Sequence, residues 1–130
     1  MVSVTETKLA WSTEIINTNA RNEDDGMANM NTIKALNPDL SKYPAFKWCA
    51  DYGTDWYLPA FNELRTIYKV KSTIKSALSA NGYTSLEAYD YWSSTEEDGS
   101  DAEKLYFSSG YTSNNCTKTY VEYIRAVLAF

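Results

Sequence analysis

The chain has 130 residues, a formal net charge of −5 at pH 7 and no histidine. This length fits one domain, and the scattered Lys and Arg residues argue against nucleic acid as a partner, because phosphate binding needs clustered basic side chains. Without histidine the chain lacks the most common general base and zinc ligand. We therefore expect a binding protein that is not an enzyme and that uses no metal or cofactor.

The tyrosine content is the unusual feature of the composition. The chain has eleven Tyr, a side chain that suits a core but also suits a contact surface, because it is large, stiff and polar at its end. No stretch approaches a membrane span, and the first residues lack the basic start and apolar run of a signal peptide. We expect no membrane insertion. A place outside the cell, on a cell surface or in a phage particle would then depend on something beyond this chain.

The first two thirds of the chain predict helices after one short strand. The expected elements are a strand over 8–16 and helices over 27–36, 44–52 and 59–80. Apolar residues recur at helical spacing in the first and third helices. Pro44 suits the first turn of the second helix, and Asn81 and Gly82 are common at the end of a helix such as the third.

After Gly82 the pattern changes to that of strands and turns. We expect strands over 89–95 and around Leu105 and Phe107, an acidic loop over 96–101, turns at 108–110 and 113–115, and a β-rich end over 120–130. Because the helices come first and the strands last, the order indicates an α+β fold.

Cys49 and Cys116 are too few to diagnose a disulfide framework. Cys49 has core-like neighbours in Phe46 and Trp48, which favours free thiols. A disulfide between the two cysteines stays the alternative.

Three motifs follow one another along the chain. They are Asp55-Trp56-Tyr57-Leu58-Pro59 with Glu63-Leu64, then Tyr91-Trp92-Ser93-Ser94-Thr95-Glu96, and finally Ile124-Arg125-Ala126-Val127-Leu128-Ala129-Phe130. In this order they resemble a bacterial and phage adhesin family with a C-type-lectin-like fold. That family includes the C-terminal domains of some collagen-like adhesins and the variable proteins of diversity-generating retroelements.

The resemblance implies one α+β domain over residues 1–130. Two main helices would pack on a small, mostly antiparallel sheet, with the N- and C-terminal strands close together. Glu63 and Arg125 would either pair across the fold or make separate backbone hydrogen bonds. The family often has Ser or Thr at the position of Ala60, so the cap of the following helix must come from elsewhere or be missing.

The motif aromatics Trp56, Tyr57 and Trp92 are expected in the core rather than in a sugar site. Within the C-terminal third, the residues that look fixed are Trp92, Ala102, Leu105, Phe107, Gly110, Val127, Leu128 and Phe130. Between them lie small polar residues and Tyr, as expected where a retroelement miscopies the adenines of Asn and Tyr codons. Glu103 and Glu122 do not fit this pattern.

Tyr, Ser, Asn and Gly at this density are typical of antibody contact loops. We therefore expect a variable ligand-display region over about 92–124 that recognises a protein or glycan on a cell surface. The expected binding residues are Glu97, Asp98, Gly99, Asp101, Lys104, Tyr106, Ser108, Ser109, Tyr111, Ser113, Asn114, Asn115, Cys116, Tyr120 and Glu122. The alternative is a fixed glycan- or glycosaminoglycan-binding adhesin domain. For the acidic loop, calcium stays an alternative to solvation, although the spacing of an EF-hand is absent.

Overall fold

The computed structural model describes residues 1–129. Its elements are β1 (Thr7–Ala10), α1 (Gly26–Leu36), α2 (Pro44–Tyr52), β2 (Trp56–Tyr57), α3 (Phe61–Lys69), α4 (Lys71–Ala80), β3 (Asp90–Glu96), β4 (Asp101–Tyr106), β5 (Thr112–Thr117), β6 (Val121–Ile124) and β7 (Val127–Leu128). The predicted α+β class with a mostly antiparallel sheet is confirmed, and the described chain has four helices in place of the two main helices expected.

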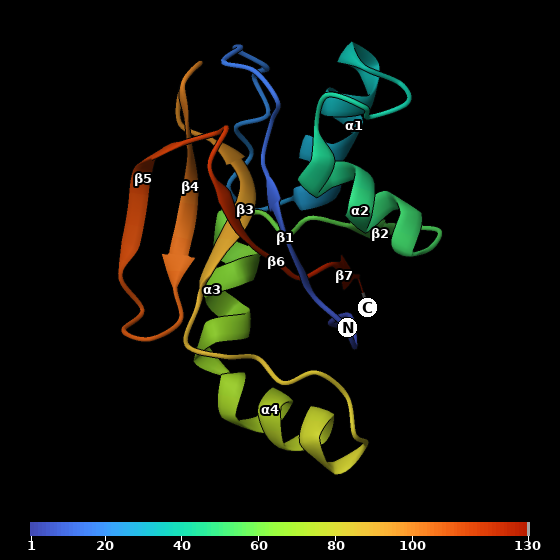
Figure 1. The fold of residues 1–130 in the computed structure, drawn as a ribbon, viewed down its shortest axis with the longest axis vertical. Coiled ribbons are helices and arrows are strands. Elements are labelled where there is room, and N and C mark those ends of the chain that lie inside the picture. Colours follow the sequence, from blue (N-terminus) through green and yellow to red (C-terminus); the bar gives the residue numbers. More distant parts are fainter. Residues whose placement is uncertain (130) are drawn as a thin grey trace.

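The larger sheet has the strand order β1-β6-β3-β4-β5, and all its pairs are antiparallel except β3 with β6. Helix α3 lies behind this sheet, α1 and α2 lie beyond its β1 edge, and the β4–β5 hairpin forms the opposite edge (Figure 1). The two ends of the chain meet, because Val2 bridges Val127 and the Met1 amino group donates to the Leu128 carbonyl oxygen at 2.7 Å.

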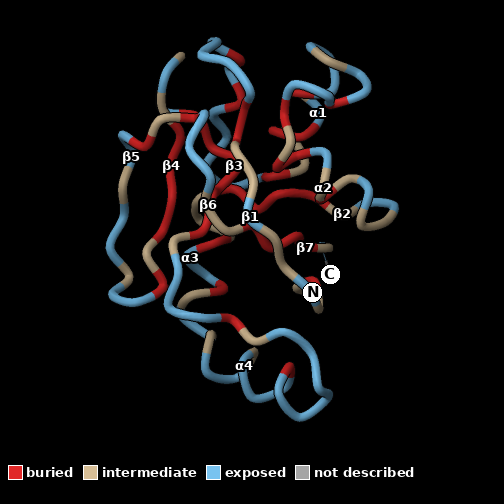
Figure 2. The backbone as a smooth tube through the Cα atoms, viewed as in Figure 1, coloured by how far each residue is buried: buried red, intermediate tan, exposed pale blue. Residues whose placement is uncertain are grey.

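The expected single helix over 59–80 is wrong. The chain forms α3 and α4 with a break at Val70, whose N–H is shared between the carbonyl oxygens of Thr66 and Ile67. Helix α3 buries Leu64 and Ile67, whereas most of α4 is exposed (Figure 2). No Gly or Pro marks the break, so the usual sequence signal for the end of a helix is missing.

Helix α3 begins without a capping side chain at Ala60. The Glu63 carboxylate accepts from the Ala60 N–H at 3.0 Å, and the Thr95 hydroxyl oxygen accepts from the Phe61 N–H at 3.0 Å. The same carboxylate accepts from the Gly26 N–H at 2.7 Å and from the Tyr57 hydroxyl at 2.6 Å. The cap therefore comes from inside the helix and from β3.

Arg125 is buried and makes its own bonds. Its guanidinium donates to the Glu6 carboxylate at 2.8 Å and to the carbonyl oxygens of Ser3, Thr84 and Ser85 at 2.6 to 2.8 Å. Glu63 and Arg125 therefore have separate partners, and they do not pair with each other.

Two of the local predictions in the strands are wrong. The N-terminal strand ends at Ala10, and residues 13–17 are exposed after the buried Trp11 and Ser12. Residues 113–115 are not a turn, because they lie inside β5, which pairs with β4. A register shift between Ala102 and Lys104 interrupts the ladder, and a bulge of this kind is hard to predict from alternation alone.

The core includes Trp11, Phe46, Tyr57 and Trp92, all of them buried. Trp56, which was also expected there, is only half-buried in β2. Phe130 lies outside the described residues. Within residues 1–129, no helix combines the length and the hydrophobicity needed to cross a membrane.

Candidate ligand-binding surface

The structure spreads the predicted binding residues over one hairpin and its two ends. Glu97, Asp98 and Gly99 lie in the β3–β4 loop, and Asp101 begins β4. The turn after β4 carries Ser108 and Ser109 at the other end of the hairpin. The remaining residues lie on or beside the strands: Lys104 and Tyr106 on β4, Tyr111 before β5, Ser113, Asn114, Asn115 and Cys116 on β5, Tyr120 before β6, and Glu122 on β6.

These residues differ sharply in exposure. Exposed residues are Glu97, Asp98, Ser108, Ser109, Tyr111, Asn114, Asn115 and Tyr120. Lys104 and Cys116 are buried, and the others are half-buried. Tyr111 and Tyr120 are 72% and 61% exposed. The predicted set therefore divides into an exposed part, which can meet a ligand directly, and a buried part that supports the sheet.

Lys104 organises the buried part. Its ammonium group donates to the Glu122 carboxylate at 2.9 Å and to the Asp90 carboxylate at 3.2 Å, and it lies 5.0 Å from the centre of the Tyr106 ring. Burial lowers the pKa of Lys104, but the two carboxylates outweigh that effect and raise it above its ordinary value. The side chain is a fixed cation that joins β3, β4 and β6.

Cys116 lies beside this ion cluster. Its Sγ atom is 3.8 Å from the Glu122 carboxylate, and burial raises the pKa of the thiol. Both cysteines are free and buried, which agrees with the favoured prediction of free thiols. A buried thiol with a raised pKa is mostly protonated at pH 7 and is a poor nucleophile.

Glu96 anchors the loops beside the surface. It was expected in the acidic loop, but it is the last residue of β3 and is fully buried. Its carboxylate pairs with the buried Lys118 and accepts from the N–H groups of Thr18 and Asn19 at 2.8 and 2.9 Å. Burial raises the pKa of Glu96, but these donors outweigh burial and lower it.

The same anchor fixes the β3–β4 loop. The Lys118 N–H donates to the Ser100 carbonyl oxygen at 3.0 Å. In the loop, the Asp98 carboxylate accepts from the N–H groups of Ser100 and Asp101, both at 2.8 Å, as in an Asx turn. The acidic loop is therefore an ordered, partly solvated turn. No group of three or more His, Cys, Asp and Glu residues within residues 1–129 could hold a metal ion.

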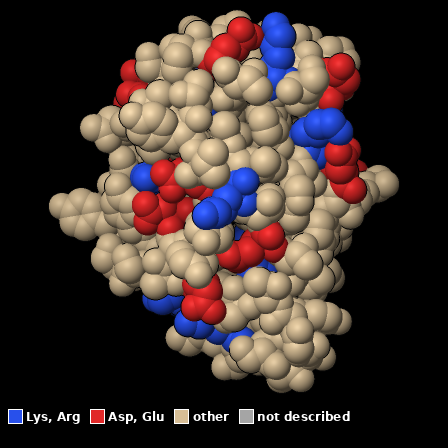
Figure 3. Space-filling model, viewed as in Figure 1, with Lys and Arg blue, Asp and Glu red and all other residues tan. Residues whose placement is uncertain are grey.

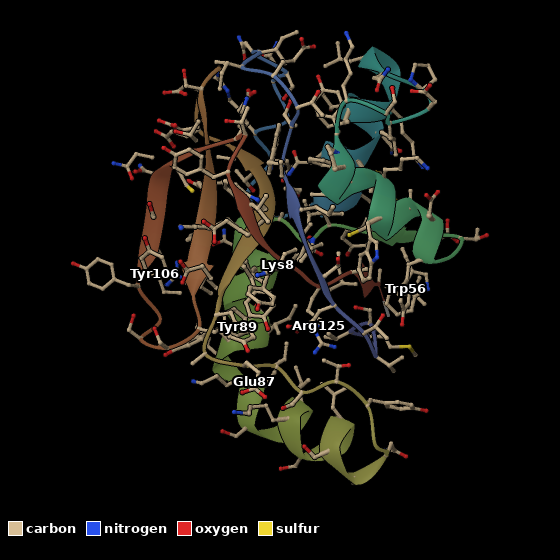
Figure 4. All side chains as sticks on the ribbon, in the orientation of Figure 1. Lys8, Trp56, Glu87, Tyr89, Tyr106 and Arg125 are labelled. Atoms are coloured by element: carbon tan, nitrogen blue, oxygen red, sulfur yellow. The ribbon has the colours of Figure 1, made fainter. Side chains whose placement is uncertain are left out.

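The turn at the other end of the hairpin requires a glycine. Gly110 has a φ of +76°, and a Cβ atom there would lie 2.8 Å from the Tyr68 ring. Its neighbour Tyr111 lies 6.5 Å from Tyr106 between ring centres. Tyr106 lies on the β4 side of the molecule, and Trp56 lies on the opposite side (Figure 4).

Sequence reasoning missed two features near this surface. The Tyr89 and Tyr123 rings stack at 4.0 Å with Lys8 above Tyr123 at 5.4 Å, and Figure 4 places Lys8 beside Tyr89. Glu103, on β4, is buried beside Phe61 at the start of α3. The signal for Glu103 was present, because alternation places it on the same side of β4 as the core residues Leu105 and Phe107.

The visible face in Figure 3 carries acidic and basic groups of both signs, separated by wide uncharged areas. The fold and surface together define a small α+β domain that presents an ordered, mostly uncharged hairpin, which is held by buried ion pairs. The sequence model of the family described as "Lcl C-terminal domain" matches residues 1–128. The chain belongs to this family.

A search of solved structures finds the same fold in a fimbrial protein from Bacteroides ovatus ATCC 8483. The TM-score is 0.76 at 14% sequence identity, with 96% of this chain covered. The chain spans only 34% of that protein, so the likeness concerns one part of a longer molecule. No curated protein matches the sequence.

Proposed function

We propose that the domain is a ligand-display module of C-type-lectin-like fold, which binds a protein or glycan on a cell surface through the β4–β5 hairpin and its adjoining loops. One observation carries the proposal. Buried side chains such as Lys104 and Glu96 are held by ion pairs, whereas most of the exposed residues of the β4–β5 turn and of β5 are Ser, Asn and Tyr. A rigid support under adaptable contact residues is the arrangement used by binding loops on immunoglobulin scaffolds.

The exposed aromatics would supply most of the affinity. Tyr111 and Tyr120 present large rings to solvent at opposite ends of the hairpin. Tyr is enriched among the few residues that dominate binding energy, because it buries much area with little loss of side-chain entropy. Ser108, Asn114 and Asn115 would add hydrogen bonds that adjust to the ligand.

An adhesin-like role at a surface agrees with the relatives. The family and the fimbrial protein that shares the fold support a domain that works as the binding part of a longer surface protein. The buried, protonated thiol of Cys116 and the absence of histidine from the sequence favour binding over catalysis.

We further propose that the hairpin is the variable region of a diversity-generating retroelement protein. Positions such as Ser108, Asn114 and Asn115 are exposed, so substitutions there change the contact surface at small cost in stability. The test is the DNA beside the gene. A near-identical repeat that differs at adenines, next to a reverse transcriptase gene, would support the proposal, and its absence would leave a fixed adhesin domain.

The binding proposal is tested with the purified domain on whole cells. We expect Tyr111→Ala and Tyr120→Ala each to weaken cell binding about tenfold or more, measured by flow cytometry with labelled protein. Tyr83→Ala is the matched control, because Tyr83 is exposed but follows α4, outside this surface. Loss of binding only in Tyr83→Ala would contradict the proposal. Protease or glycosidase treatment of the cells separates a protein from a glycan ligand.

A further inference from the structure

A small hollow lies between the hairpin and the start of α3. It has a volume of about 190 Å³ and is lined by Phe61, Glu103, Thr112, Ser113 and Asn114. Two of these residues, Ser113 and Asn114, belong to the proposed binding surface, so a ligand on that surface can reach the hollow. Its lining combines an aromatic ring, a carboxyl group, hydroxyls and an amide.

Glu103 is the unusual member of this lining. It is 8% exposed, and its buried Oε2 atom has no donor partner among the described residues. The side chain that interacts with this carboxyl group, Glu23, is itself a carboxyl group. A buried acceptor that lacks a donor costs about 1–3 kcal/mol, and more if it is charged. Native structures rarely keep such a group without a reason, and one reason is a ligand that supplies the donor.

The charges around Glu103 are mostly negative. Burial, together with the carboxylates of Glu23, before α1, and of Glu97, in the β3–β4 loop, raises the pKa of Glu103 to about 7. The nearest cation to the lining is Arg65 of α3, whose guanidinium lies over the Phe61 ring at 5.9 Å. Arg65 makes no ion pair with Glu103 among the described contacts. A second cation would therefore be attracted to the hollow.

We propose that this hollow binds the ammonium or guanidinium group of a Lys or Arg side chain on a protein ligand, with Glu103 as its counter-ion. An ammonium group has three donors to place, and the carboxylate, the hydroxyls of Thr112 and Ser113 and the Asn114 amide oxygen are acceptors at hand. The Phe61 ring favours a cation above its face. The inference rests on the proposed ligand-display function, and it names the chemistry of one contact.

Proton linkage gives the inference a distinctive signature. The carboxyl group must ionise to attract the cation, so binding strengthens as pH rises through about 7. We expect Nα-acetyl-lysine methylamide to bind about thirtyfold more tightly at pH 8 than at pH 5.5, because the ionised fraction of Glu103 rises by that factor. Binding is followed by NMR shifts of the amides of residues 112–114. In the reverse direction, the probe lowers the pH at which the Glu103 carboxyl titrates.

The controls separate the charge from the shape of the site. Glu103→Gln keeps the shape and is expected to abolish both the binding and its pH dependence, whereas Glu87→Gln, at an exposed site before β3, is expected to change neither. Nα-acetyl-norleucine methylamide, which lacks the charge, is expected not to bind. Glucosamine tests whether an amino sugar is the better occupant.

Three results would overturn the inference. The first is equal binding by wild type and Glu103→Gln, and the second is tighter binding of glucosamine than of the lysine probe. The third is entry of Arg65 into the hollow, which would show as a change in the Glu103 titration in Arg65→Gln. If the probe fails while Tyr111→Ala still weakens cell binding, the inference fails alone. If the probe binds while the tyrosine variants bind cells normally, the display function fails.

Discussion

At the scale of single residues, this domain relies on a few buried charges, each held in a different way. Arg125 pairs with Glu6 and donates to three carbonyl oxygens, and Lys118 pairs with Glu96. Breaking one partner of such a pair typically costs about 3–5 kcal/mol, because the other charge stays buried. Glu103 alone among these charged residues has an orphaned oxygen.

Glu103 is therefore expected to limit stability at alkaline pH. A carboxyl pKa raised from 4.5 to about 7 in the folded state contributes stability that is complete below pH 4.5 and is lost as pH rises through about 7. We predict that, between pH 5 and pH 8, wild type loses about 2 kcal/mol of unfolding free energy relative to Glu103→Gln. Urea unfolding of both proteins at the two pH values measures this difference. Parallel pH profiles would show that Glu103 does not titrate in this range.

At the scale of elements, one carboxylate joins three segments. Glu63 caps α3 at Ala60 and also holds the start of α1 at Gly26 and the Tyr57 hydroxyl on β2. Gly26 is needed at this junction, because a Cβ atom there would lie 2.5 Å from the Leu58 carbonyl oxygen. These bonds hold the start of α1 next to the start of α3, the helix that packs against β3 and β4.

This junction gives a prediction for Glu63→Gln. The amide nitrogen cannot accept, so the Tyr57 hydroxyl can no longer donate to it and must accept instead, and the bonds from Ala60 and Gly26 lose their charged acceptor. We expect a loss of about 1–3 kcal/mol in unfolding free energy, measured by urea denaturation. Glu14→Gln is the control, because Glu14 forms only an exposed ion pair with Lys42 and surface pairs contribute about 0–1 kcal/mol. Equal effects of the two changes would contradict the role given to Glu63.

Elements with strong local signals were predictable, and those set by tertiary contacts were not. Helix α2 has the predicted bounds of 44–52, because Pro44 and Gly53 mark its ends. The break at Val70 and the strand pairing of residues 113–115 have no local signal. The pairing of residues 113–115 depends on β4, and strand propensity alone does not encode it.

At the scale of the whole molecule, the domain separates a fixed support from an exposed face. Motif residues such as Tyr57, Trp92 and Val127 could be assigned to the support from sequence, because they are apolar and lie in short apolar runs. The sequence also predicts a candidate surface in the C-terminal third. It could not show that Lys104 and Cys116 are buried while Tyr111 and Tyr120 are exposed, because that division depends on the register of β4 with β5 and on the register shift within it.

The separation is the central claim, and thermal unfolding of one combined variant tests it most directly. The variant carries Ser108→Ala, Tyr111→Ser, Asn114→Ser, Asn115→Ser and Tyr120→Ser, all at exposed positions. Surface changes away from special features each shift stability by about 0.5 kcal/mol or less, so we predict a cooperative transition with Tm within about 5–10 °C of wild type. Loss of the cooperative transition would contradict the account, because these residues would then belong to the fold and not to a display surface.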